Sequence, residues 1–414
     1  MAICDTQGPK GNIEVKKGMG LVSEVFSAGD LEVLSGNLGI GHVRYSTTGG
    51  STVENAQPIA MNYIKGTLAL VHNGNLTNAQ ELKEKQMHRG QAHYTTTDSE
   101  VLAYEIVSKR VRSANIEEAV KKVAATMKGG FACIVMSPRK LIGFRDPYGL
   151  KPLILGKKED AYIFASESAA ILSVGGEVIR DVLPGEIITI KKDGIHSDTT
   201  LCKKKAAHCI FEYIYFARND SVIDGISVYD ARFRAGQALA KTEVPEADLV
   251  AGVPDSGLIA AQGYAAASGF PFALIFHKNS YIGRSFIKPT DKERRDAVHM
   301  KLSVIKSIVS GKRIVLIDDS IVRGTTMRQI IIMLREAGAK EVHVRISSPP
   351  FLYPCYYGTD VPSTKQLIAS EHSAEEICKN IGADSLRYLE VRDFKTMVGD
   401  LPLCCACFNG KYPV

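Results

Sequence analysis

Long apolar runs are missing from this sequence. No window of its 414 residues approaches the roughly 18 consecutive apolar residues that a membrane-spanning helix needs. The opening residues, MAICDTQGPKGN, also lack the charged and apolar regions of a secretory signal peptide. We therefore expect no membrane partner and a cytoplasmic location.

A basic surface spread along the chain is missing too. The formal net charge is +6, but the stretch from Lys278 to Arg313 contains ten Lys or Arg and three Asp or Glu and so carries +7 by itself. A local basic segment is typical of a phosphate site, whereas polyanion binding requires an extended basic surface. We expect no nucleic-acid partner.

Internal repeats, low-complexity segments and long linkers are also absent, but the pattern of the chain changes near residue 205. Before it, short β-rich runs alternate with Gly, Pro and Asn turns, and two stretches, 98–111 and 116–128, have helical periodicity. After it, apolar strands alternate with amphipathic helices, which favours a parallel sheet with crossover helices. The predicted domains are therefore 1–205 and 206–414.

The strongest motif is RIVLIDDSIVRGTT at residues 313–326, an apolar strand followed by Asp318, Asp319, a glycine-containing loop and a helix. Ligands of parallel sheets bind beyond the carboxyl ends of the strands, and helix N-termini bind phosphate. The carboxylates could hold ribose hydroxyls and Mg²⁺. An isolated Asp pair would more simply cap a turn.

This motif resembles the phosphoribosyl pyrophosphate motif of type I phosphoribosyltransferases. The resemblance implies that Ser256, in AGVPDSG, binds near the metal and the diphosphate, so that Ser256, Asp318 and Asp319 would hold Mg²⁺. It also makes KNSYIGRSFIKPTDKERRD a loop that closes over substrate, although such a stretch alone would suggest a solvated surface loop. The implied substrate-binding residues are Ser256, Lys278, Tyr281, Arg284, Asp318, Asp319, Ser320, Arg323, Gly324, Thr325 and Thr326.

The first half contains GHVRYSTTG, VHNGNLTN, TDSEVL, FRDPYGLKPL and ASESAAI in that order. Together they resemble the class II glutamine amidotransferase domain, an N-terminal-nucleophile hydrolase with an αββα sandwich. The resemblance implies that Arg44 binds the glutamine carboxylate, that Asp98 binds its α-amino group, and that Asn73 and Gly74 form the oxyanion hole. A guanidinium suits a carboxylate, and fixed donors stabilise an oxyanion. Taken singly, HNGN also suits a tight turn and TDSE a helix cap.

The start of the chain departs from that family, whose mature chain begins with a cysteine activated by its own α-amino group. Here the chain opens Met1-Ala2-Ile3-Cys4, and a thiol at Cys4 has no free amine beside it. We expect Cys4 to be a strand residue without a catalytic role, the family's first strands to be absent, and the chain as written to depend on ammonia. The sequence does not distinguish a fragment from a misplaced start.

Nine cysteines in a cytoplasmic protein do not suggest a disulfide framework. The chain resembles clostridial and Bacillus-type amidophosphoribosyltransferases, in which four cysteines hold a [4Fe-4S] cluster. Four thiolates also suit zinc, and without a metal Cys209 and Cys355 would be core thiols before a disordered tail. Cys405 competes with Cys404 for pairing with Cys407, but the x2 spacing favours Cys404. Carried over by motif, the ligands are Cys209, Cys355, Cys404 and Cys407.

The resemblance covers nearly the whole chain and implies formation of 5-phosphoribosylamine from phosphoribosyl pyrophosphate and glutamine-derived ammonia, the first step of purine synthesis. It also implies feedback inhibition by purine nucleotides and a homo-oligomer. One alternative is an ammonia-dependent transferase with an inactive glutaminase. Another is a non-catalytic sensor of phosphoribosyl pyrophosphate or nucleotides, which the complete Asp-Asp and RGTT set disfavours.

Overall fold

The computed structural model divides the chain into two compact units. The first unit comprises Met1–His208 with two later segments, Cys355–Asp360 and Pro413–Val414, and the second comprises Cys209–Pro354 and Val361–Tyr412. No helix among the described residues is long and apolar enough to cross a membrane. The structure describes residues 1–7, 12–44, 49–202, 204–279, 302–359, 361 and 363–413.

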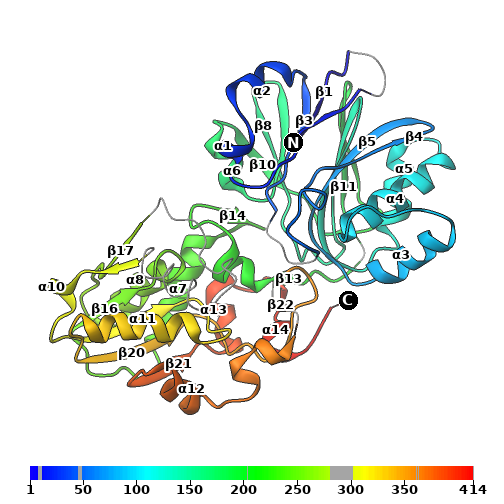
Figure 1. Cartoon of the computed structure of the whole chain (residues 1–414). Helices are drawn as coiled ribbons and strands as arrows, with labels where there is room; N and C mark the ends of the chain where they lie inside the picture. The colour runs from blue at the N-terminus through cyan, green and yellow to red at the C-terminus, as the bar shows by residue number, and fades with distance from the viewer. Residues whose placement is uncertain are drawn as a thin grey trace. The chain divides into compact units, whose positions relative to one another are not determined.

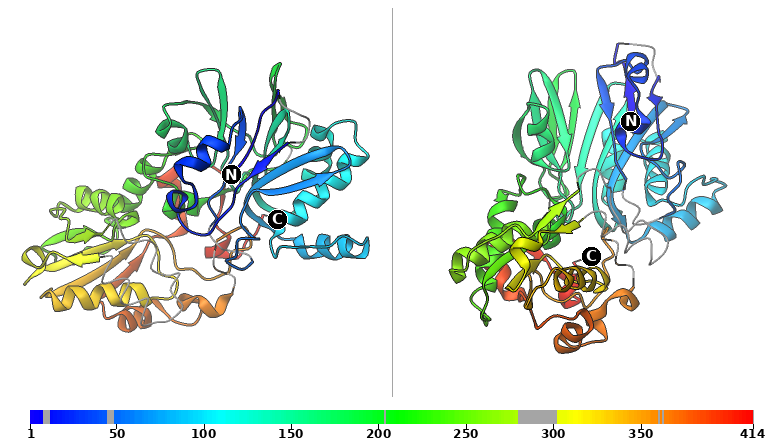
Figure 2. Two further views of the ribbon diagram at one scale, coloured as in Figure 1. Left: turned by 45° about the horizontal axis from the view of Figure 1, so that its top comes forward. Right: turned by 60° about the vertical axis from the view of Figure 1, so that its left-hand side comes forward.

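The first unit is built around a six-stranded antiparallel sheet in the order β12-β11-β7-β6-β5-β4, accompanied by two three-stranded sheets, β2-β1-β3 and β10-β8-β9. Helices α3 to α5 gather on one side of the large sheet (Figures 1 and 2). The elements are β1 (Ala2–Cys4), β2 (Glu14–Val15), α1 (Val22–Val25), α2 (Ala28–Val33), β3 (Leu38–Ile40), β4 (Ile59–Tyr63), β5 (Gly66–Leu76), α3 (Ala79–His88), α4 (Asp98–Val111), α5 (Ile116–Ala124), β6 (Gly129–Ser137), β7 (Lys140–Arg145), β8 (Ile154–Lys158), β9 (Ala161–Ala165), α6 (Ser168–Ser173), β10 (Glu177–Asp181), β11 (Ile187–Lys191) and β12 (Gly194–Asp198).

Alternation along β5 explains why this sheet is buried on both faces. Leu68 and Leu70 belong to one core cluster with Leu102 and Ile106 of α4. Ala69, between them in sequence, belongs to a second cluster that includes residues of β1 and β3. Successive side chains of a strand point to opposite faces, so an unbroken apolar run fits a sheet covered on both sides. The predicted αββα sandwich is confirmed.

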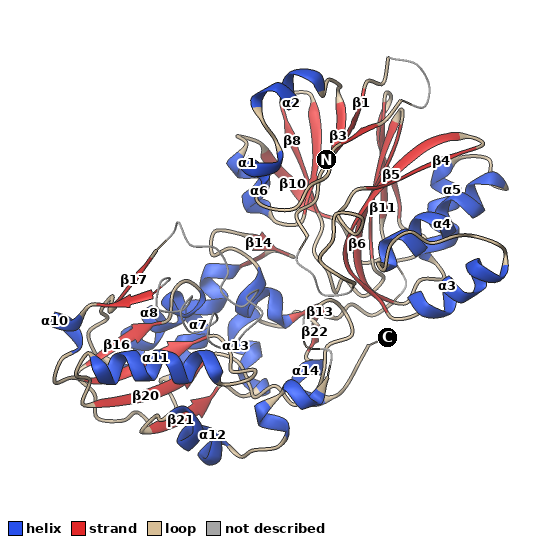
Figure 3. Cartoon of the chain, viewed as in Figure 1, coloured by secondary structure: helices blue, strands red, loops and turns tan. Residues whose placement is uncertain are grey.

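The second unit contains a four-stranded parallel sheet in the order β16-β19-β20-β21. Helices flank both faces, with α11 and α12 on one and α7, α8 and α13 on the other (Figure 3). The predicted parallel-sheet transferase fold is therefore also confirmed. The elements are β13 (His208–Cys209), η1 (Glu212–Phe216), β14 (Val222–Ile223), β15 (Ile226–Ser227), α7 (Val228–Leu239), β16 (Leu249–Gly252), α8 (Ser256–Ser268), β17 (Phe276–Lys278), β18 (Leu302–Val304), α10 (Lys306–Val309), β19 (Arg313–Asp318), α11 (Thr325–Glu336), β20 (Glu341–Ile346), η3 (Thr364–Gln366), η4 (Ile368–Ser370), α12 (Ala374–Ile381), β21 (Ser385–Tyr388), η5 (Val391–Asp393), α13 (Phe394–Val398), β22 (Leu403–Cys404) and α14 (Ala406–Asn409).

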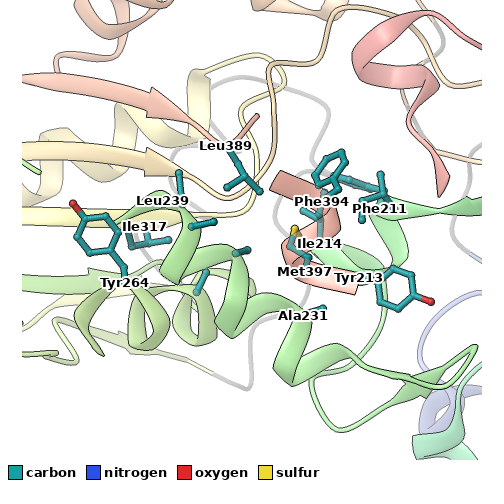
Figure 4. Packing of buried hydrophobic residues seen from close by; sticks show 14 of the residues in the cluster. Phe211, Tyr213, Ile214, Ala231, Leu239, Tyr264, Ile317, Leu389, Phe394 and Met397 are labelled. Carbon is teal, nitrogen blue, oxygen red and sulfur yellow. The ribbon is translucent and has the colours of Figure 1, made fainter. Parts of the chain in front are cut away.

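Close contact between α7 and α8 positions the start of α8. A Cβ on Gly236 would lie 1.8 Å from the carbonyl oxygen of Ala260, and one on Gly263 would lie 1.9 Å from that of Phe233. Only glycine fits at both positions. Figure 4 shows the core beside these helices, in which Tyr213, Ala231, Leu239, Ile317 and Met397 belong to one buried cluster. The packing fixes Ser256, the first residue of α8, relative to the sheet.

Candidate active sites

The carboxyl edge of the parallel sheet brings Ser256 and the Asp318-Asp319 pair together. Asp318 is the last residue of β19, and β16, which precedes α8, pairs with β19 in parallel. The Ser256 hydroxyl donates to Oδ1 of Asp319 at 2.6 Å, and the Ser320 hydroxyl donates to Oδ2 at 2.5 Å. The Asp319 amide donates to Oδ1 of Asp318 at 2.9 Å. Hydroxyls and carboxylates thus converge at the predicted magnesium site.

Both carboxylates are strongly perturbed by their surroundings. Burial raises the pKa of Asp318 well above its usual range, and the neighbouring Asp319 charge raises it further. Burial also raises the pKa of Asp319, although hydrogen bonds from Ser256 and Ser320 oppose the shift. Two buried acids side by side favour a bound cation, because its charge would stabilise their ionised forms.

The loop after β19 forms a helix N-terminus that is open for an anion. Gly324 caps α11 with φ +77, a left-handed conformation that suits glycine. Thr325 and Thr326 follow in the first turn, and both are exposed. The Arg323 guanidinium donates to the side-chain oxygen of Gln366 at 2.5 Å. Exposed amides and hydroxyls at a helix start fit a phosphate group.

Of the basic residues, Lys278 ends β17 and forms an ion pair with Asp255, directly before Ser256. These two side chains line a cavity of about 170 Å³ together with residues that include Gly252 and Phe276. Tyr281 and Arg284, which were also predicted to bind substrate, lie outside the described residues.

In the first unit, Asp98 is hydrogen-bonded to β5, the strand that contains the predicted oxyanion-hole residues Asn73 and Gly74. Asp98 begins α4, and its Oδ2 accepts a 2.9 Å hydrogen bond from the amide of Leu76, the last residue of β5. Burial raises the pKa of Asp98, but the interaction with His72 and the backbone hydrogen bonds outweigh it, so the net pKa is lowered. Asp98 is thus held as an anion, as binding an α-amino group requires.

Arg44 lies within electrostatic reach of Asp98. Burial lowers the pKa of Arg44, and the Asp98 carboxylate opposes that shift. Its guanidinium donates to the carbonyl oxygens of Gly50 at 3.0 Å and Gly49 at 3.2 Å. The two predicted glutamine-binding residues are therefore near enough to interact electrostatically.

Asn73 and Gly74 lie near the end of β5, opposite Ala132 and Phe131 of β6. Gly74 has φ +130, and a Cβ there would lie 2.0 Å from the carbonyl oxygen of Gly130. No other residue fits there, so the glycine of HNGN is explained by both backbone conformation and close contact.

Two residues of the segment ENAQP (residues 54–58) connect these parts but were missed from sequence. Asn55 donates to Gly50 O and Thr96 Oγ1, both at 2.8 Å, and accepts from the Thr96 amide at 2.9 Å. Gln57 donates to His72 O at 3.0 Å and accepts from the His72 amide at 2.6 Å. Both side chains are buried. The Asn55 side chain thus links Gly50, which accepts from Arg44, to Thr96, close in sequence to Asp98. The Gln57 side chain is bonded to the backbone of His72 in β5, next to Asn73.

Cys4 lies in β1, as predicted, and is buried. Burial raises the pKa of its thiol, with the Asp5 charge adding to the shift. A buried thiol of raised pKa is a poor nucleophile, in agreement with the structural role expected for it.

Three of the four predicted cluster cysteines belong to the second unit, where β13, ending at Cys209, pairs with β22, ending at Cys404. Cys407 lies in α14, and its carbonyl oxygen accepts a 3.1 Å hydrogen bond from the amide of Tyr353. Tyr353 precedes Cys355 by two residues. Cys355 is grouped with the first unit. In the part of the chain that the structure describes, no three His, Cys, Asp or Glu side chains are grouped closely enough to hold a metal ion. Cys405 is buried in the apolar core, where burial and the nearby Cys404 raise its pKa to about 12.

Two family models match separate parts of the chain. A family model described as a glutamine amidotransferase domain matches residues 42–173, and one described as a phosphoribosyl transferase domain matches residues 228–347. The amidophosphoribosyltransferase of Bacillus subtilis is 46% identical over 418 residues, which cover 99% of this chain and 87% of the relative. That of Archaeoglobus fulgidus is 46% identical over 407 residues, covering 97% and 89%.

Solved structures agree. The chain is similar to the glutamine phosphoribosylpyrophosphate amidotransferase from B. subtilis complexed with ADP and GMP, with 44% identity, a TM-score of 0.90 and coverage of 100% of this chain and 90% of that one. A structure described as the allosteric regulatory enzyme of purine biosynthesis gives 45% identity and a TM-score of 0.91, with coverage of 100% and 89%. With both domain types in the same order and close relatives along nearly its full length, the chain belongs to the amidophosphoribosyltransferase family.

Proposed function

We propose that this enzyme forms 5-phosphoribosylamine from phosphoribosyl pyrophosphate and ammonia in its second unit, and that its first unit binds glutamine as the ammonia source. The observation that carries the proposal is the convergence of Ser256, Asp318 and Asp319 beside the exposed helix start at Thr325. A non-catalytic sensor would not need this set, and the family relationship does not favour that alternative.

The transferase site supplies separate places for the parts of its substrate. The N-terminus of α11, with Thr325 and Thr326, would hold the 5-phosphate, and Asp318 and Asp319 would hold the ribose hydroxyls. The two carboxylates and the Ser256 hydroxyl are hard oxygen donors, which fit Mg²⁺ bound together with substrate phosphates. Bound there, Mg²⁺ would supply positive charge for the departing pyrophosphate. Ammonia forms the new bond to C1 as the bond to pyrophosphate breaks, with inversion, and then loses a proton.

The first unit offers complementary groups for glutamine. Arg44 would pair with the α-carboxylate and Asp98 with the α-amino group, while Asn73 and Gly74 would donate hydrogen bonds to the side-chain oxygen as it gains negative charge. Asn55 and Gln57 hold these groups in place through the hydrogen bonds described above. Hydrolysis of the side-chain amide by water would yield glutamate and ammonia. The buried Cys4 is not an amine-activated nucleophile for that step, so we expect turnover of the chain as written to depend on ammonia.

We further propose that Cys209, Cys355, Cys404 and Cys407 hold a [4Fe-4S] cluster. The pairing of β13 with β22 and the x2 spacing of Cys404 and Cys407 support this donor set. Bound there, the cluster would tether the C-terminal segment and would take no part in turnover.

Feedback by purine nucleotides also belongs to the proposal, supported by the ADP and GMP in the B. subtilis structure. The homo-oligomer and the cytoplasmic location stay predictions.

The test is to supply purified protein and Mg²⁺ with phosphoribosyl pyrophosphate and either ammonium or glutamine, and to follow pyrophosphate release. Ammonia-dependent release is expected. Absence of release with ammonium at saturating concentration would reject the transferase assignment. Glutamine tests the first unit separately, through glutamate formation, which we expect at background rates only. A glutamine-dependent rate comparable to the ammonia-dependent rate would contradict that expectation.

A further inference from the structure

A short segment from the second half of the chain contacts the predicted oxyanion hole of the first unit. This segment, residues 355–358 and called the strap below, follows β20 in sequence, yet it is grouped with the first unit, whereas Pro354 and Val361 on either side belong to the second. The chain thus leaves the second unit for only six residues before it returns.

Three residues of the strap each lie against a residue in or beside the predicted oxyanion hole. The Asn75 side-chain amide donates to the carbonyl oxygen of Tyr356 at 2.9 Å. Tyr357 is buried, and a Cβ built on Gly130 would lie 3.1 Å from the Cβ of Tyr357. A Cβ on Gly358 would lie 3.1 Å from Cα and 3.2 Å from the carbonyl carbon of Gly74. The strap therefore contacts Gly74, its neighbour Asn75 and the opposing Gly130.

Gly74 is consequently enclosed on two sides. The Gly130 carbonyl oxygen leaves no room for a side chain on one, and Gly358 lies against its backbone on the other. Gly358 itself has φ +110, a conformation that residues with a Cβ rarely adopt. Donors in an oxyanion hole act only when they are fixed in place, and a misplacement of a few tenths of an ångström lowers the rate.

We propose that the strap, through Gly358 and Tyr356, positions the predicted oxyanion-hole residue Gly74 to bind the side-chain oxygen of glutamine. This inference rests on the proposed glutamine site of the first unit. Because Pro354, directly before the strap, belongs to the second unit, a shift of the chain at that residue would reach the glutamine site through Gly358. Its residues contact no reacting atom and act only through Gly74 and Asn75.

The main test is Gly358→Ala in the full chain, because the added methyl group would displace either the strap or Gly74. We expect the affinity for L-glutamine, measured by calorimetric titration, to fall about tenfold to a hundredfold, because the side-chain oxygen of glutamine then meets a displaced donor. The ammonia-dependent rate should stay within about twofold.

The matched control is Gly194→Ala in the β11-β12 hairpin. Gly194 has φ +115, close to that of Gly358, but nothing lies within 4 Å of the position of its Cβ. It therefore reproduces the backbone strain without the contact. Asn75→Asp is a second test, since it replaces the donor to Tyr356 O by an acceptor without adding bulk, and the same fall in affinity is expected. Equal losses of affinity in Gly358→Ala and Gly194→Ala, or an unchanged affinity in both strap variants, would overturn the proposal.

Amide hydrogen exchange at residues 72–77 provides a readout that needs no turnover. L-Glutamine should protect these amides in the parent and in Gly194→Ala, but not in Gly358→Ala. A parent protein that neither binds glutamine nor shows this protection would reject the proposed glutamine site itself. Protection retained in Gly358→Ala with unchanged affinity would reject the strap alone.

Discussion

Ser256 donates a 2.6 Å hydrogen bond to Asp319, a residue 63 positions later in the sequence. The bond joins the start of α8 to the end of β19, so the pyrophosphate loop and the acidic pair form one site.

Asp319→Ala should abolish the ammonia-dependent reaction, with a loss of at least about a hundredfold, because it removes a carboxylate from the ribose and metal position. The measurement is pyrophosphate release with ammonium as the nitrogen donor. Asp248→Ala is the matched control, since Asp248 pairs with Arg313 at the opposite end of β19 and should affect stability more than rate. Activity retained in Asp319→Ala would refute the role assigned to it.

Asn55→Ala should weaken glutamine binding about tenfold or more, since one lost buried hydrogen-bonding group costs roughly 1 to 3 kcal/mol. The affected bonds fix Gly50 and Thr96 beside Arg44 and Asp98. Calorimetric titration with L-glutamine measures the change. Asn115→Ala deletes the N-cap of α5 and should cost about 1 kcal/mol of stability without changing the affinity. Unchanged binding in Asn55→Ala would show that the network does not hold the site.

Acid should destabilise the first unit through His42. Burial lowers the pKa of His42 from 6.5 to about 4, and the nearby His72 and Arg44 contribute. Between these two pH values the unfolded chain takes up a proton that folded His42 does not. The free energy of unfolding should therefore fall as pH drops from 6.5 to about 4, by up to about 3 kcal/mol from this residue.

Denaturant titrations of the parent and of His42→Gln across that range test this expectation. The variant should lose less stability on acidification than the parent. His196→Gln, at an exposed histidine of the same unit, should follow the parent curve. Parallel curves for parent and His42→Gln would contradict the prediction.

Protein purified without oxygen should be brown, contain about four iron per chain and lose both colour and stability in air, as a Cys₄ cluster implies. Iron analysis and visible absorption provide the measurement. Cys209→Ser and Cys407→Ser should each lose the cluster, because each removes a ligand.

Cys405→Ser is the matched control and should keep the colour, because its x1 spacing to Cys407 is poorer than the x2 spacing of Cys404. Stoichiometric zinc in place of iron would show that the metal is wrong. Colour lost in Cys405→Ser but kept in Cys404→Ser would show that the ligand set is wrong.

Local patterns in the sequence predicted several elements closely. The stretch 98–111 was predicted as a helix, and α4 spans Asp98–Val111. The apolar run before Asp318 and Asp319 was predicted as a strand and forms β19. Helix α3 at Ala79–His88 was not predicted, because its sequence, AQELKEKQMH, has only one buried residue, Gln86, and so lacks an apolar face. Periodicity reports which residues face a core, and it fails where few do.

What the sequence determined by itself was therefore the chemistry: the acidic pair, the phosphate loop and the ordered glutaminase motifs, each of which lies within a few consecutive residues. The tertiary structure alone decided which distant residues hold those groups. Asn55 meets Thr96 across 41 positions, and Asn75 meets Tyr356 across 281. Such contacts form only after strands from separate parts of the chain have paired, so no local pattern encodes them.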